Sequence, residues 1–129
     1  MSDRDPNFEA LKTRSFDPAG LWARVNGDLE LLRELVRIFS EERPRLLQNI
    51  SVAIEQGSCE DVKKFSHKLK GSALQFSGTG VATLAASLEL MGEHKRLEGA
   101  ARVFSDLEQE VANLEKLLHS MTAGERQAG

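Results

Sequence analysis

Residues 62–76, VKKFSHKLKGSALQF, are the stretch of this 129-residue chain that most clearly indicates its fold class. Each helical residue turns the side-chain direction by about 100°, so the apolar residues of the stretch fall within roughly 60° of one another. They are Phe65, Leu69, Ala73 and Phe76. The spacing predicts an amphipathic helix with this face buried.

The segments on either side repeat the same helical periodicity, with apolar residues three and four positions apart. Residues that cap or end helices separate these segments. The helices expected on this basis lie within residues 17–26, 28–57, 58–76, 81–92 and 97–121. Pro44 falls inside the second of them, where the missing N–H predicts a bend.

The start of each early helix carries a suitable capping residue. Asp17 precedes Pro18, which is favourable at the first helical position, and Asp28 precedes the second helix. Ser58 followed by Asp61 resembles a capping box for the third. These local signals agree with the apolar periodicity.

No segment alternates apolar and polar residues over a strand's length, so the chain is expected to be all-α. Four substantial helices with short connections fold most simply as an up-down-up-down four-helix bundle, here with a short additional N-terminal helix. We expect the bundle over residues 16–121, with flexible tails at residues 1–15 and 122–129.

Composition narrows the classes of partner and compartment. The net charge is only −3 with both signs interspersed, which disfavours binding to nucleic acid or to an anionic membrane. The single cysteine, Cys59, cannot form an intramolecular disulfide, and no apolar run approaches the roughly 20 residues that span a bilayer. We expect a cytoplasmic monomer.

His67 is the first candidate for a functional residue. It points about 160° from the centre of the buried face, which predicts exposure to solvent. Gly71 follows one turn later on the same side, although glycine costs about 0.5–1 kcal/mol relative to alanine inside a helix. A missing Cβ there would let another molecule approach the imidazole.

Cations and one leucine surround this histidine on the helical wheel. Lys63, Lys70 and Leu74 point within roughly 60° of it, and Lys64 flanks its other side. A neutral imidazole nitrogen can attack phosphorus, and phosphoryl transfer depends mainly on positioning and charge neutralisation. Lys70 could supply that positive charge. The group suits a phosphoryl acceptor and donor better than a hydrolase.

The sequence SHKLKGSALQF at residues 66–76 resembles the H-x-L-K-G-[SA]-[SA] signature of histidine-containing phosphotransfer (HPt) domains. These domains shuttle phosphate between receiver domains in multistep phosphorelays. The stretch GDLELLRELVRIFSEE at 27–42 resembles the preceding helix of the family, and Val81, Leu84 and Leu88-Glu89 fall at its later positions. The similarity spans about residues 17–120.

The resemblance implies a role for each matching residue. His67 would be the phosphorylation site, Lys70 would stabilise the phosphoryl group, and Glu89 would orient the imidazole. The receiver-binding residues expected on this face are Lys63, Lys64, Lys68, Gly71, Leu74 and Gln75. The chain departs from the family at Ser77, where many members have glycine.

The same resemblance implies partners and cofactors. Receiver domains of response regulators or hybrid histidine kinases would supply the acidic residue and the Mg²⁺, and this chain would need no cofactor of its own. His94 and His119 have no companions at metal-ligand spacing, so no metal site is expected.

Three functions compete on the sequence alone. The leading one is a phosphorelay intermediate without autonomous catalysis, which takes phosphate on His67 from one receiver aspartate and passes it to another. The alternative is a non-phosphorylated helical adaptor that binds and inhibits a receiver or kinase, although the intact His67 disfavours it. The third is an enzyme that uses His67 as a nucleophile on a small phosphoester, but the sequence offers no pocket-forming glycine-rich loop and no second catalytic group.

Overall fold

A computed structural model of the chain describes residues 16–128, with side chains as far as residue 123. The tail expected at residues 1–15 therefore lies outside the described residues. The helices are α2 (Pro18–Arg24), α3 (Leu29–Gln56), α4 (Cys59–Gln75), α5 (Thr79–Glu93) and α6 (Ala100–Ala128). Residues 16–128 contain no strand, which confirms the all-α prediction.

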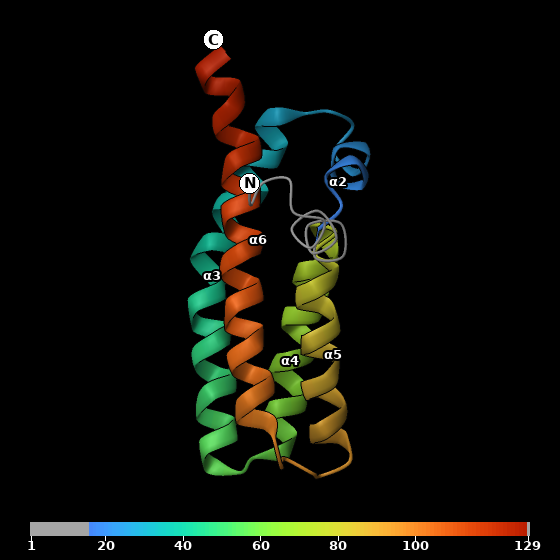
Figure 1. The fold of residues 1–129 in the computed structure, drawn as a ribbon, viewed down its shortest axis with the longest axis vertical. Helices are drawn as coiled ribbons and strands as arrows, with labels where there is room; N and C mark the ends of the chain where they lie inside the picture. Colours follow the sequence, from blue (N-terminus) through green and yellow to red (C-terminus); the bar gives the residue numbers. More distant parts are fainter. Residues whose placement is uncertain (1–15, 129) are drawn as a thin grey trace, which may run out of the picture.

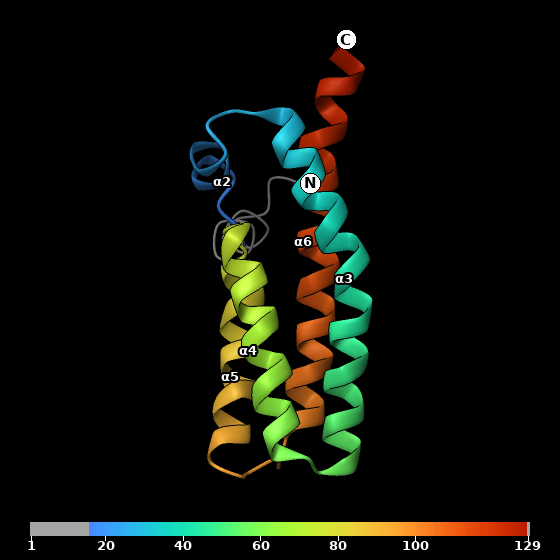
Figure 2. The ribbon, with the colours of Figure 1, turned by 180° about the vertical axis from the view of Figure 1, so that it is seen from behind.

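The four long helices run alternately up and down, as Figures 1 and 2 show from opposite sides. α3 contacts α4, α4 contacts α5, α5 contacts α6, and α6 closes the ring against α3. The predicted up-down-up-down bundle is confirmed. The short α2 lies at the end of the bundle where α4 ends and α5 begins.

α2, α3 and α4 begin at the capping residues that the sequence predicted. Asp17, Asp28 and Ser58 each accept a hydrogen bond from the backbone N–H three residues further on, at 3.1, 3.0 and 3.4 Å. These bonds satisfy N–H groups that have no partner inside the helix. α3 ends at Gln56 and is capped by Gly57, which has φ +69°. The helix continues unbroken through Pro44, and Figure 2 shows its first turns inclined to its last.

α6 differs from the expected helix at both ends. It begins at Ala100, after Gly99 with φ +79°, so Leu97 lies in the preceding connection, although it still packs against the core. A left-handed residue cannot belong to the right-handed helix. α6 also continues past Met121, where we expected it to end, to Ala128.

The core confirms the buried face of the histidine helix. Leu69, Ala73 and Phe76 are buried and Phe65 packs against them in part. The ring of Phe76 lies 5.2 Å, centroid to centroid, from that of Phe39 on α3. Phe16, which the sequence analysis did not place in the core, is also fully buried there.

The connection between α4 and α5 contains Ser77, at the position where the sequence resemblance leads us to expect glycine. Ser77 has φ +55°, in the left-handed region that glycine enters most easily. Its carbonyl accepts the backbone N–H of Asp17 at 3.1 Å, which ties the start of α2 to this turn. The serine therefore adopts a backbone conformation suited to glycine.

α4 and α5 approach closely at Gly92. A Cβ built there would lie 2.6 Å from the carbonyl oxygen of Cys59 and 2.8 Å from the backbone nitrogen of Lys63. Both neighbours are backbone atoms in the first turns of α4, which cannot simply rotate away. Glycine at this position therefore determines how closely the two helices pack.

We expect Gly92→Ala to lower the free energy of unfolding by about 1–3 kcal/mol, because the added methyl group overpacks this contact. Chemical denaturation would measure it. The matched control is Gly71→Ala, since a Cβ at Gly71 meets nothing within 4 Å and the change should stabilise by up to about 1 kcal/mol. Equal stability of Gly92→Ala and the parent protein would contradict the tight packing.

Candidate functional site

His67 lies on the outer face of α4, as the helical wheel predicted. Its side chain is 67% exposed, whereas Ser66 and Leu69 beside it are completely buried. Buried neighbours therefore anchor the backbone of His67, while its imidazole is accessible to an approaching molecule.

Glu89 of α5 binds both the histidine and a lysine. One carboxylate oxygen, Oε2, lies 2.8 Å from Nδ1 of His67, and the other, Oε1, lies 2.7 Å from Nζ of Lys70. Lys70 and His67 come from adjacent turns of α4, and Glu89 reaches them from the neighbouring helix. The arrangement agrees with the expected position of Glu89, and it adds the ion pair with Lys70.

The ionisation of Glu89 decides which nitrogen of the His67 imidazole donates the hydrogen bond. The hydrogen bond from Lys70 lowers the pKa of Glu89 below its ordinary value; partial burial opposes this, and the hydrogen bond from His67 lowers it further. Glu89 is therefore ionised at neutral pH and can only accept hydrogen bonds. Nδ1 of His67 is then the hydrogen-bond donor, and in a neutral imidazole this places the lone pair on Nε2.

Gly71 leaves an opening beside the imidazole. A Cβ added at this position would meet no other atom within 4 Å, so the packing of the bundle does not require glycine here. Glycine inside a helix makes the helix less stable than alanine would, and at this position no close packing compensates for the loss. The space that it leaves is open to the outside of the molecule.

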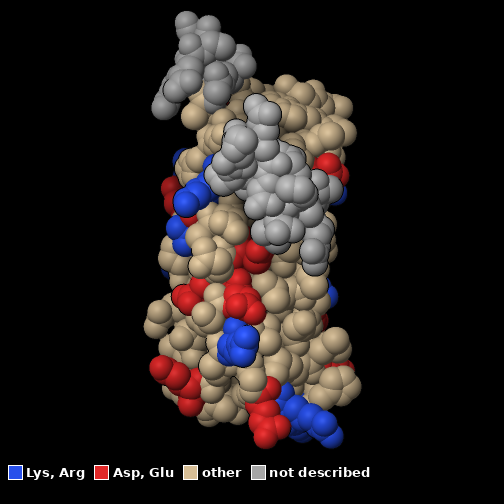
Figure 3. Space-filling model, in the orientation of Figure 1, with Lys and Arg blue, Asp and Glu red and all other residues tan. Residues whose placement is uncertain are grey.

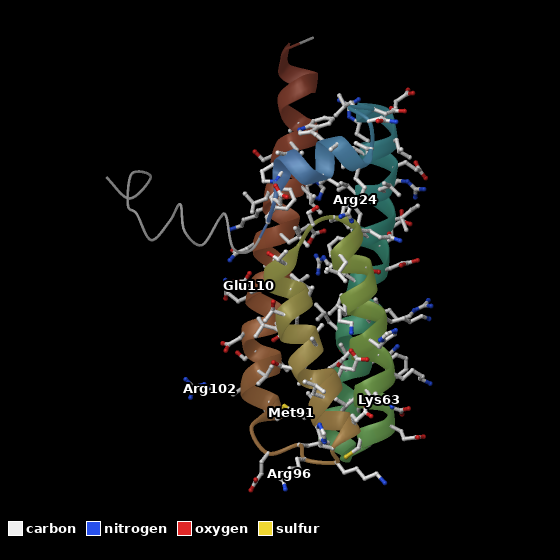
Figure 4. All side chains as sticks on the ribbon, turned by 90° about the vertical axis from the view of Figure 1, so that its right-hand side faces the viewer. Arg24, Lys63, Met91, Arg96, Arg102 and Glu110 are labelled. Atoms are coloured by element: carbon white, nitrogen blue, oxygen red, sulfur yellow. The ribbon has the colours of Figure 1, made fainter. Side chains whose placement is uncertain are left out.

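Leu74 extends this surface toward α2. Its side chain is 46% exposed and does not turn into the bundle, and Gln75 beside it is exposed as well. Arg24 of α2 donates a hydrogen bond to the carbonyl oxygen of Leu74, and Figure 4 shows Arg24 between α2 and the end of α4. His67, Gly71 and Leu74 form one exposed stripe.

The lysines of α4 do not form one group. Figure 4 shows Lys63 where α4 runs beside the end of α5, and its Nζ lies 3.6 Å from a carboxylate oxygen of Glu93. Lys64 lies 3.9 Å from Asp61. Lys68 instead lines a hollow toward α3 that also contains acidic side chains. Only Lys63 and Lys64, together with Lys70, stand near the imidazole.

A shallow depression surrounds His67 and contains acids that the sequence analysis missed. It is lined by Glu60, Asp61, Lys63, Lys64, His67 and Glu89. The sequence could have indicated them, because acidic residues are favoured in the first turn of a helix and the first turn of α4 lies about two turns before His67. The surroundings of His67 are therefore mixed in charge.

The described residues also bear on three other features: a basic surface patch, a metal site and a membrane-spanning helix. On the face shown in Figure 3, the described lysine and arginine side chains are scattered among acidic ones. Within the described residues, no group of three or more His, Cys, Asp and Glu side chains could hold a metal ion. None of the described helices is long and apolar enough to cross a membrane.

An antiparallel helical bundle that presents one histidine, held by a carboxylate and flanked by lysines, has the features of a phosphocarrier. The family model described as Hpt domain matches residues 34–117, so the chain belongs to the Hpt domain family. Members of this family are phosphocarriers, and the chain is a phosphotransfer intermediate of a phosphorelay that interacts with receiver domains.

Two solved structures share the fold. Histidine-containing phosphotransfer protein B (HptB) from Pseudomonas aeruginosa PAO1 is 19% identical, with a TM-score of 0.70 over 87% of this chain and 96% of that one. Histidine-containing phosphotransfer protein MtHPt2 from Medicago truncatula is 23% identical, with a TM-score of 0.75 over 98% of this chain and 91% of the other. No curated protein sequence matches the chain significantly.

Proposed function

We propose that His67 accepts a phosphoryl group from the aspartate of one receiver domain and passes it to an aspartate of another. The observation that supports this most is the imidazole itself, whose side chain is 67% exposed while its Nδ1 is bound to Glu89. Nε2 is then the ring nitrogen left for an in-line attack on phosphorus, which requires an accessible lone pair.

The chain contributes a phosphoryl acceptor, and the receivers contribute the remaining chemistry. In this proposal the receiver supplies the acidic residue and the Mg²⁺ that neutralise the transferring group. Lys70 adds one positive charge from the histidine side, and the chain alone catalyses no turnover. It acts as a monomer in the cytoplasm.

Incubation of the purified chain with each phosphorylated receiver of its source organism tests the proposal. We expect one or more receivers to transfer phosphate to the chain as an acid-labile, base-stable label, as phosphohistidine gives. Binding of receivers without any label would instead support the helical adaptor. Turnover of a small phosphoester without a receiver would support an enzyme.

We expect Lys70→Ala to slow transfer about tenfold without preventing receiver binding, because it removes one charge that stabilises the transferring group. Rapid-quench kinetics and a binding titration would separate the two effects. The ion pair with Glu89 is partly exposed, so its loss should change the free energy of unfolding by less than about 1 kcal/mol. Lys116→Ala, which removes an exposed lysine from α6, is the control and should transfer normally.

A further inference from the structure

Each of the two carboxylate oxygens of Glu89 accepts a hydrogen bond from a different residue of α4. Lys70 binds Oε1 at 2.7 Å, and the Nδ1 hydrogen of His67 binds Oε2 at 2.8 Å. The side chain of Glu89 is only 18% exposed, whereas that of His67 is 67% exposed. The ion pair with Lys70 therefore holds the largely buried carboxylate of Glu89 in place beside Nδ1 of the imidazole.

Phosphorylation changes the charge of that ring. When the Nε2 lone pair forms the N–P bond, the P–O bond to the receiver aspartate breaks, and its electron pair leaves on the aspartate oxygen. The ring already carries a hydrogen on Nδ1, so it becomes a positively charged imidazolium. The ring can then either keep that proton or lose it to water.

We infer that Glu89 keeps the proton on Nδ1 of His67 after phosphorylation, so that the phosphorylated ring remains an imidazolium at neutral pH. The inference rests on the proposed function and adds to it the protonation state of the phosphorylated ring. A carboxylate hydrogen-bonded to a cation stabilises the charged form of that cation. Glu89 is thus a positioning residue that acts through His67.

The retained proton matters for the second transfer. When the N–P bond breaks, its electron pair returns to Nε2. From a protonated ring the leaving group is neutral imidazole, whereas from a deprotonated ring it would be an imidazolate anion, which is a much poorer leaving group. Glu89 therefore keeps the phosphohistidine in the form that readily donates phosphate to the next receiver.

Other charged groups near the ring are largely paired with one another. On α4, Lys64 lies 3.9 Å from Asp61, and Glu60 also lines the depression. Lys63 of α4 lies 3.6 Å from Glu93 of α5. Among the described side chains, Glu89 is the carboxylate within hydrogen-bond distance of His67.

The test is a ³¹P NMR titration of the phosphorylated protein with Glu89→Gln as the variant. Phosphoramidate, a small-molecule phosphoryl donor, labels the chain without a receiver, and comparison with His67→Gln identifies the signal of His67. Glutamine preserves the shape and can accept the same hydrogen bond, but it has no charge. We expect the phosphorylated ring of Glu89→Gln to lose its proton about one pH unit lower than that of the parent protein.

The lifetime of the label provides a second readout. Because the protonated ring is the reactive form, a lower pKa leaves less of it at neutral pH, so Glu89→Gln should hold its phosphate several-fold longer. Glu93→Gln is the matched control, since it removes the same charge one turn along α5 from a residue that pairs with Lys63. It should shift the titration by much less than Glu89→Gln does.

The outcomes distinguish a failure of the inference from a failure of the proposed function. Coincident titration curves for the parent protein and Glu89→Gln would overturn the inference while leaving the proposed function intact. A parent ring with its hydrogen on Nε2, seen by ¹⁵N NMR before phosphorylation, would overturn it as well. A chain that neither phosphoramidate nor any phosphorylated receiver labels at His67 would overturn the proposed function itself.

Discussion

Replacing His67 with glutamine is expected to abolish the uptake of phosphate while leaving the helical bundle intact. The side chain is 67% exposed, and its hydrogen bond to Glu89 is one that a glutamine amide can also donate. Surface substitutions of this kind usually change the free energy of unfolding by no more than about 0.5 kcal/mol. Radiolabel transfer from a phosphorylated receiver and circular dichroism would measure the two effects.

His119 on α6 supplies a matched control for this experiment. It is also a surface histidine near a glutamate, with its Nε2 3.8 Å from an oxygen of Glu115 and a side chain that is 60% exposed. His119→Gln should take up phosphate like the parent protein. Undiminished labelling of His67→Gln would mean that another residue accepts the phosphoryl group.

Replacing Gly71 with glutamine is expected to reduce transfer from a receiver at least tenfold and to make the isolated protein more stable. The new side chain would occupy the open space beside the imidazole, where the visiting receiver must approach. Glycine is a poor helix former, so its replacement should stabilise α4 by up to about 1 kcal/mol. Transfer kinetics and thermal melts on the same preparation would measure the loss of transfer and the gain in stability.

Leu74→Asp tests the apolar part of the same surface. Because Leu74 is 46% exposed, a charge there should weaken receiver binding by about tenfold with little change in melting temperature. Gly71→Ala, with a single added carbon, should be stabilised as Gly71→Gln is but lose less transfer. Normal transfer by Gly71→Gln, or an unfolded Leu74→Asp protein, would contradict docking across His67, Gly71 and Leu74.

The sequence by itself determined the helices, their caps and the outward direction of His67. Apolar spacing and capping depend on residues within one or two turns of each other, so they can be read locally. The buried face through Leu69 and Ala73 and the exposed stripe through Gly71 follow from the 3.6-residue period alone. The family signature lies within the same stretch.

The ends of α6 show where local signals are weak. Gly99 has φ +79°, and α6 begins only after it, although the apolar spacing continues unchanged from Leu97. Beyond Met121 the residues include good helix formers such as Ala, Glu, Arg and Gln, and the loss of apolar periodicity there did not end the helix. Periodicity identifies a buried face, and it marks helix ends only loosely.

Only the tertiary structure decided how the atoms around the imidazole are paired. The resemblance places Glu89 near His67, but the sharing of its two oxygens between His67 and Lys70 depends on how α5 is rotated and shifted against α4. That register is set partly at Gly92, where a missing Cβ lets α5 contact the backbone of α4. Contacts between residues distant in sequence depend on such packing, which no local pattern encodes.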